Sequence, residues 1–382
     1  MLAKRLEQLH PYVPGEQPKD RVYIKLNANE NPYPPHRSVA AAVAKACRCQ
    51  RKRLGLYPDP DSCELRSAIA RMLNQTGGVF CRSQVTGKKC SPSPEDTLPF
   101  ELTAENIFCG NGSDEVLSFV FYTFFDNDRP LVFPEHTYSF YPVYCGYYNI
   151  PMNRIPLKAD WSLDKEKMLE QANTSDSATI FANPNAPTGI SLSRVELKDM
   201  LSRAPKNKVF IVDEAYCDFG GQSAIPLLKD FPNLVVVRTF SKSLSFAGQR
   251  LGYVVASPEL IKAIFTVKNS FNHFPVDFLT QQAGIASCKA AYYYAEKSRL
   301  VVEERQSLTD FLRQRGWFVI DSSTNFIFAK KEGIAGHRIY EEVKKSGILI
   351  RHFNTPGIED FVRITIGTKK QNNALKAALK NI

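Results

Sequence analysis

Residues 235–252 read VVVRTFSKSLSFAGQRLG and contain both a strand pattern and a candidate reactive group. The run VVV is typical of a buried β-strand, and the polar residues after it are typical of a tight turn. The turn carries Ser241 and Lys242, and Arg250 follows eight residues after the lysine. A lysine amine becomes a nucleophile when it is neutral, which a second cation nearby favours. Lys242 is therefore the leading candidate for a covalent catalytic residue.

Around this stretch, short apolar runs alternate with helical patterns. The runs are IFCGNG, LVFP, ATIFANP, KVFIVDEA, NLVVVRTFS and LGYVVAS. Near-continuous Val, Ile and Phe suit strands that are covered on both faces, and the intervening helices suit crossover connections. The sequence therefore predicts an α/β fold with a mainly parallel, seven-stranded sheet between about Ile107 and Ser257.

Polar motifs follow four of these runs, at the point where each strand would end. They are GNGSDE (110–115), NPNAPTG (183–189), DEAY (213–216) and SKSLSFAGQR (241–250). Ligands of open α/β sheets collect beyond the carboxyl ends of the strands, so these motifs are expected to converge. Together they supply an anion cradle at a helix N-terminus, a carboxylate, a phenol and an amine. A pyridoxal phosphate site requires this set of groups.

The rest of the chain predicts an arm and a second domain. Residues 1–35 are rich in Pro and Asn and lack periodicity, so we expect an extended arm that packs with the smaller domain. Residues 36–274 form the predicted large domain, in which the polar stretch 77–99 has the features of a surface insertion. Residues 275–382, with long helices and then short strands, form the predicted small α+β domain.

Composition limits the possible partners and the cellular location. Lys and Arg exceed Asp and Glu by 49 to 39, a net charge of +10, but the basic clusters at 48–53 and 88–89 lie in no nucleic-acid module. The nine cysteines lack paired CxxC spacing, which favours reduced thiols over a metal site. The absence of a signal core and of a membrane-length apolar run predicts a cytoplasmic protein that binds neither nucleic acid nor membrane.

In their order along the chain, GNGSDE, NPNAPTG, DEAY, SKS and AGQR resemble the motifs of the fold-type I pyridoxal-phosphate aminotransferases. The resemblance covers nearly the whole chain. The stretches PYVPGEQP, LNANENP, YPDP, PEHTYSFY, GILIRHF and FVRITIG narrow it to the branch that acts on histidinol phosphate. It implies a large sheet domain, a smaller α+β domain and pyridoxal 5'-phosphate as cofactor.

The resemblance also implies a role for each matching residue. The catalytic residues are Lys242, which forms the Schiff base with the cofactor, Asp213, which pairs with the pyridine nitrogen, and Tyr216, which contacts the ring hydroxyl. The other implied cofactor contacts are Ser241, Arg250 and the backbone of Gly112, Ser113 and Asp114 on the phosphate, Tyr138 on the ring face, and Asn185 on the ring hydroxyl. The family often has Asn directly before PTG, where this chain has Ala186, and Asn185 stands one residue earlier. Tyr57 would reach the cofactor phosphate of a neighbouring subunit, which implies a homodimer with shared sites.

Substrate binding is assigned by resemblance to Arg351 and Arg363, with Tyr12 and Asn29 of the arm closing over the substrate. Alternation in VRITI places Arg363 and Thr365 on one face of a strand and the apolar residues on the other. Planar guanidinium groups suit both a phosphate and a carboxylate.

The implied reaction is a ping-pong transamination between histidinol phosphate and 2-oxoglutarate, which gives imidazole acetol phosphate and glutamate. An aromatic or broad-specificity aminotransferase and a threonine-phosphate decarboxylase share most of these residues and remain alternatives. A regulator that uses a pyridoxal-phosphate domain as a sensor is a further alternative, but about 35 residues of arm are too few for a DNA-binding module.

Overall fold

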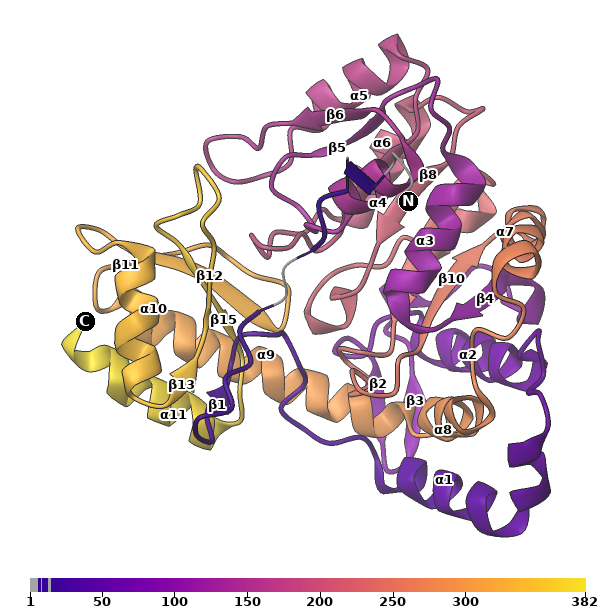
Figure 1. Cartoon of the computed structure of the whole chain (residues 1–382), viewed down its shortest axis with the longest axis horizontal. Helices are drawn as coiled ribbons and strands as arrows, with labels where there is room; N and C mark the ends of the chain where they lie inside the picture. The colour runs from indigo at the N-terminus through magenta and orange to yellow at the C-terminus, as the bar shows by residue number, and fades with distance from the viewer. Residues whose placement is uncertain (1–5, 8, 13–14) are drawn as a thin grey trace.

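The computed structural model describes residues 6–7, 9–12 and 15–382. The N-terminal residues 1–5, 8, 13 and 14, which belong to the predicted arm, lie outside the described residues. Two sheets are surrounded by helices (Figure 1). The helices are α1 (Arg37–Cys49), α2 (Cys63–Thr76), α3 (Gly112–Phe124), α4 (Tyr141–Tyr148), α5 (Lys165–Thr174), α6 (Arg194–Arg203), α7 (Pro258–Phe271), α8 (Phe278–Cys288), α9 (Ala291–Arg313), α10 (Gly336–Lys345) and α11 (Lys369–Ala378).

The larger sheet has seven strands, which is the number that the sequence predicts. In spatial order they are β4 (Ile107–Gly110), β10 (Gly252–Ala256), β9 (Leu234–Thr239), β8 (Phe210–Asp213), β7 (Thr179–Ala182), β5 (Leu131–Pro134) and β6 (Met152–Ile155). β10 pairs antiparallel with β4 and with β9, and the other four pairs of this sheet are parallel, so the prediction of a mainly parallel α/β sheet is confirmed. The sequence runs identified six of these strands and missed β6, an edge strand whose residues are mostly not buried.

The two faces of this sheet pack into separate apolar clusters. In β9, Val236 joins a cluster with α2, α5, α6 and α8, whereas Val235 and Val237 join a cluster with α3, α4 and α7. Successive residues of a strand point to opposite faces, so each face needs its own apolar set. Burying one such side chain contributes about 1.5–3 kcal/mol, which explains why these strands are continuously apolar.

The smaller sheet packs against the C-terminal helices. Its strands are β11 (Trp317–Val319), β12 (Phe326–Lys331), β15 (Val362–Thr365) and β14 (Arg351–His352), all paired antiparallel. Helix α9 connects the two apolar regions, because Tyr294 packs in a cluster of the large sheet and Leu308 packs with the small sheet. The predicted domain limits at residues 35/36 and 274/275 stay a prediction.

The N-terminal arm pairs with the C-terminal part of the chain. Its strand β1 (Ile24–Lys25) runs parallel to β13 (Ile348–Leu349), and Leu26 is buried beside the small sheet. The predicted extended arm is therefore held by strand pairing. The arm then crosses between the two sheets toward α1 (Figure 1).

The polar stretch 77–99 forms a small hairpin and is also anchored in the core. The hairpin consists of β2 (Gln84–Thr86) and β3 (Lys89–Ser91). The buried carboxylate of Asp96 accepts hydrogen bonds from Arg82 Nε at 2.7 Å and from Arg194 Nη2 at 2.6 Å. The sequence does not indicate that Asp96 is buried, because the two arginines that compensate its charge are not adjacent to it in the chain. Among the described residues, no helix is long and apolar enough to cross a membrane.

Candidate active site

A cleft with a volume of about 540 Å³ lies where three of the four predicted motifs meet, those at 183–189, 213–216 and 241–250. The strands β7, β8 and β9 run parallel and end at this edge of the sheet, so the residues that follow them meet here. Seven of the predicted site residues line the cleft: Tyr12, Asn29, Tyr138, Tyr216, Lys242, Arg351 and Arg363. The structure therefore brings residues from the arm, the large sheet and the small sheet to one place.

Lys242 projects from the turn after β9 toward the arm. Its Nζ donates to the backbone oxygen of Ala28 at 3.4 Å and lies 5.5 Å from the centroid of the Tyr216 ring. The turn itself is held by Asn31, whose Nδ2 donates to the backbone oxygens of Lys242 at 3.0 Å and Ser243 at 3.1 Å. The sequence did not identify Asn31 as a site residue, although it lies in the stretch LNANENP that carries part of the resemblance.

Asp213 ends β8 and is 4% exposed. Its Oδ2 accepts from the Tyr141 hydroxyl at 2.9 Å and its Oδ1 accepts from the backbone N–H of Ala215 at 3.1 Å. Burial raises the pKa of Asp213 to about 6, against the effect of these two hydrogen bonds. Among the described residues no Lys, Arg or His forms an ion pair with this carboxylate, so it is suited to a cation on a ligand. Tyr141, fully buried, is a site residue that the sequence did not identify among its many aromatic neighbours.

Asn29 supports Tyr216. The Asn29 Nδ2 donates to the Tyr216 hydroxyl at 2.9 Å, and its Oδ1 accepts from Thr365 Oγ1 at 3.1 Å. Asn29 is only 1% exposed, and both ends of its amide are engaged. The amide therefore positions Tyr216, and the predicted contact of Asn29 with the substrate stays a prediction.

The N-terminus of α3 carries the predicted anion cradle. The Asp114 carboxylate accepts from the Tyr138 hydroxyl at 2.8 Å and from Arg250 Nη2 at 2.9 Å. A Cβ at Gly112 would lie 2.3 Å from Arg250 Nη2, and Gly112 has φ +78°. The absence of a side chain at Gly112 therefore lets the guanidinium lie against the first turn of the helix, where the N–H groups and the cation both favour an anion.

Ser241, which follows β9, carries an unused donor. Its Oγ is buried and has no hydrogen-bond partner among the described residues. A buried hydroxyl without a partner costs free energy, so a ligand acceptor at this point would be stabilising. Ser113, in the first turn of α3, is half-buried. These donors and Arg250 fit a phosphate group, and Asp213 fits a protonated ring nitrogen, so the chain's residues suit the cofactor that the resemblance implies.

The two predicted substrate arginines approach the cleft from the small sheet. Arg363 Nη2 donates to the backbone oxygen of Asn27 at 3.4 Å, and its buried Nε has no partner among the described residues. Burial lowers the pKa of Arg363, and the nearby Arg351 cation lowers it further. Arg363 and Thr365 both contact the arm, as the predicted alternation requires. Two adjacent guanidinium groups suit a ligand with a doubly charged anionic group.

Two further residues shape the mouth of the cleft. Tyr12 is 39% exposed, and its ring centroid lies 5.2 Å from that of Phe140. Arg154 of β6 also lines the cleft. The sequence did not identify Arg154, because β6 itself was missed and no motif surrounds it.

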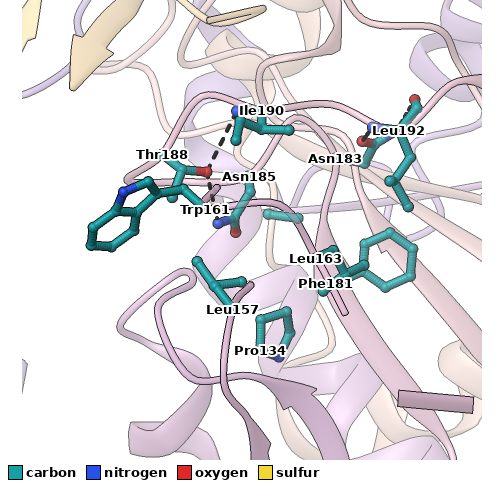
Figure 2. A pocket seen from close by; sticks show the side chains of 11 residues that line it. Pro134, Leu157, Trp161, Leu163, Phe181, Asn183, Asn185, Thr188, Ile190 and Leu192 are labelled. Carbon is teal, nitrogen blue, oxygen red and sulfur yellow. Dashed lines mark hydrogen bonds between the residues drawn. The ribbon is translucent and has the colours of Figure 1, made fainter. Parts of the chain in front are cut away.

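Asn185 and Tyr57 are among the predicted site residues that do not line the cleft; the others are Gly112, Ser113, Asp114, Asp213, Ser241 and Arg250. Asn185 lines a separate cavity, where Figure 2 shows its amide directed toward Thr188. Its Nδ2 donates to Thr188 Oγ1 at 3.1 Å and to the backbone oxygen of His136 at 3.0 Å, so both amide hydrogens are used. The predicted contact of Asn185 with a ring hydroxyl stays a prediction. Tyr57 is 83% exposed and stacks on Phe274, with 4.6 Å between ring centroids, so its predicted contact across subunits stays a prediction.

Comparisons with known proteins match the whole of this architecture. The family model for aminotransferase class I and II matches residues 21–379. Histidinol-phosphate aminotransferase of Syntrophus aciditrophicus is 46% identical over 383 residues, covering 100% of this chain and 98% of that protein. Histidinol-phosphate aminotransferase 1 of Bradyrhizobium diazoefficiens is 41% identical, covering 98% of this chain and 97% of that protein.

The fold is similar to that of solved structures. The crystal structure of histidinol-phosphate aminotransferase from Sinorhizobium meliloti, in complex with pyridoxal 5'-phosphate, superposes with a TM-score of 0.78. The match covers 94% of this chain and 91% of that chain at 23% identity. This likeness confirms the predicted fold-type I architecture.

Proposed function

The chain belongs to the class I and II aminotransferases, and from this premise we propose that it transfers an amino group between histidinol phosphate and 2-oxoglutarate. The proposal is supported by the cleft itself, where the Lys242 amine, the Tyr216 phenol and the guanidinium groups of Arg351 and Arg363 come together. The relatives named for this reaction, at 41% and 46% identity over nearly the full chain, support the choice of substrate.

Pyridoxal 5'-phosphate is the cofactor of the proposed reaction, and its protonated ring supplies an electron sink for the bonds of the substrate Cα. Asp213 would hold the ring nitrogen, Tyr216 the ring hydroxyl, and Tyr138 the ring face. Ser241, Arg250 and the backbone of Ser113 and Asp114 would hold the phosphate.

Lys242 is the proposed catalytic base, because its amine lies in the cleft beside Tyr216. It would take the proton from the substrate Cα and then donate a proton to the carbon that receives the amino group. Arg351 and Arg363 would bind the phosphate of one substrate and the carboxylates of the other in turn. The arm, which contributes Tyr12 to the cleft, would exclude water from the reacting groups.

We also propose a homodimer. Tyr57 and the neighbouring Leu54 and Leu56 are all exposed, at 83%, 48% and 67%, so this segment presents apolar surface that a second subunit could cover. A Tyr57 that reaches the partner's cofactor phosphate would make each site depend on both chains. A cytoplasmic location, the domain limits and the roles of the individual site residues are likewise proposals.

The test is a transamination assay with purified protein loaded with pyridoxal 5'-phosphate. Histidinol phosphate, phenylalanine and threonine phosphate are compared as substrates, with 2-oxoglutarate as acceptor where transamination is followed. Histidinol phosphate is expected to give the highest kcat/KM, and Lys242→Ala to give no turnover. Lys229→Ala, at an exposed lysine outside the cleft, is the matched control and should be unaffected. A preference for phenylalanine, decarboxylation of threonine phosphate, or turnover by Lys242→Ala would each refute the proposal.

A further inference from the structure

Two adjoining cavities lie on the large-sheet side of the molecule and share no lining residue with the cleft. The first, of about 470 Å³, lies between α1 and α8. The second, of about 460 Å³, lies between α2, the end of α8 and the β2–β3 hairpin. Both are lined by Lys88, Lys289 and Tyr292, so they meet at these three residues. We call the two cavities together the basic groove.

The charges in the basic groove are all of one sign. Its charged lining residues are Lys45, Arg71, Lys88, Lys89 and Lys289, and no Asp or Glu lines either cavity. Within the part of the chain that the structure describes, none of these five side chains has an ion-pair or hydrogen-bond partner. Arg82, which lies in the same 77–99 stretch as Lys88 and Lys89, by contrast pairs with Asp96. Like charges that converge without counter-charges repel one another, which an anionic ligand would relieve.

The five cations come from segments that are far apart in the sequence. α1, α2, the β2–β3 hairpin and the end of α8 each contribute (Figure 1). The hairpin tip, with Lys88 and Lys89, approaches the start of α1: burial lowers the pKa of His36, and the cations of Arg37 and Lys88 lower it further. The groove thus uses part of the 77–99 stretch and part of the excess positive charge, neither of which the proposed reaction requires.

We propose that the basic groove binds an anion with two or more linked phosphate groups. Lys88 and Lys289 line both cavities, whereas Lys45 lines only the first and Arg71 only the second. A chain of phosphates that lies across the two shared lysines would therefore extend toward a further cation in each cavity. The volume of each cavity lies within the range of small-molecule sites. Tripolyphosphate and nucleoside triphosphates share this chemistry.

The test is calorimetric titration of the pyridoxal-phosphate-loaded protein with tripolyphosphate, ATP, adenosine and orthophosphate at low salt. Tripolyphosphate is expected to bind saturably and more tightly than orthophosphate. Its affinity is expected to fall as the salt concentration rises. ATP binding more tightly than tripolyphosphate would identify a nucleotide site, and equal binding would identify a polyphosphate site. No saturable binding of tripolyphosphate or ATP would overturn the proposal, and so would orthophosphate binding as tightly as tripolyphosphate.

The variant Lys88→Gln/Lys289→Gln removes the two cations that both cavities share. Its affinity for tripolyphosphate should fall at least about tenfold, since hydrogen bonds to charged groups are among the stronger polar contacts. The control Lys229→Gln/Lys262→Gln changes the net charge equally at exposed lysines outside the groove and should bind normally. An equal loss in both variants would mean that net charge alone attracts the anion, and would refute the site. Because binding is measured directly, the result does not depend on the proposed transamination.

Discussion

Asp213 and Glu214 are adjacent acidic residues, both buried, with opposite surroundings. Glu214 accepts from Arg238 Nη2 at 2.8 Å and from Ser223 Oγ at 2.8 Å, so a protein cation compensates its charge. Asp213 has only neutral donors, Tyr141 and a backbone N–H. The two side chains lie on opposite faces of the sheet because they are neighbours at the end of one strand. A buried carboxylate with its own cation holds the fold, and one without a cation is available to a ligand.

The largest expected effect is on the Asp213 side. Asp213→Asn should lower kcat by about 10²–10³-fold, because it removes the charge that stabilises a protonated ring nitrogen. The free energy of unfolding of the cofactor-free protein should not fall, since no cation loses its partner. Steady-state kinetics and urea unfolding of the same preparation measure both quantities. An unchanged kcat would contradict the role of Asp213 toward a bound ligand.

Glu214→Gln should give the reverse result. It leaves Arg238 buried with only Asp218, at 3.4 Å, as an anionic partner. Removing one partner of a buried pair should lower the free energy of unfolding by about 3 kcal/mol. The folded fraction should keep most of its kcat, because Glu214 faces away from the cleft. A free energy of unfolding equal to that of the wild type would show that the Glu214–Arg238 pair does not stabilise the fold.

The pH dependence of stability separates the two carboxylates further. The pKa of Asp213 is about 6 in the fold, above its ordinary 3.8, so the folded state binds its proton more tightly than the unfolded state. This group therefore favours folding at low pH, and it costs about 2–3 kcal/mol as the pH rises from 4 through 6. In the cofactor-free protein, the stability of Asp213→Asn relative to wild type should rise over this range. A difference that does not vary between pH 4 and pH 8 would contradict the raised pKa.

A smaller effect is expected at Tyr141. Tyr141→Phe removes the hydroxyl that donates to Asp213 Oδ2 at 2.9 Å and keeps the ring in the core. The loss of one hydrogen bond to a charged group should lower kcat/KM about tenfold. Tyr144→Phe is the matched control, because its hydroxyl donates to the backbone oxygen of Asp114. An equal or larger loss in the control would mean that the bond to Asp213 has no special role.

The sequence predicted most of the large sheet because the buried strands are continuous apolar runs. It missed β6 because edge strands carry polar residues. It also predicted catalytic roles for Lys242, Asp213 and Tyr216, which end or follow strands in recognisable motifs; these roles stay predictions. Local pattern could not show that Glu214 is paired with Arg238, since that contact joins two strands across 24 positions of sequence. A motif position also fails to show where a side chain points, as Asn185 illustrates.

We infer that the protonated ring nitrogen of the cofactor supplies the cation that compensates the charge of Asp213. The most direct measurement is ¹⁵N NMR of the protein loaded with pyridoxal 5'-phosphate that is labelled at the ring nitrogen. The ring nitrogen is predicted to be protonated in the wild-type protein at pH 7.5 and unprotonated in Asp213→Asn. A ring nitrogen with the same protonation state in both proteins would contradict the claim.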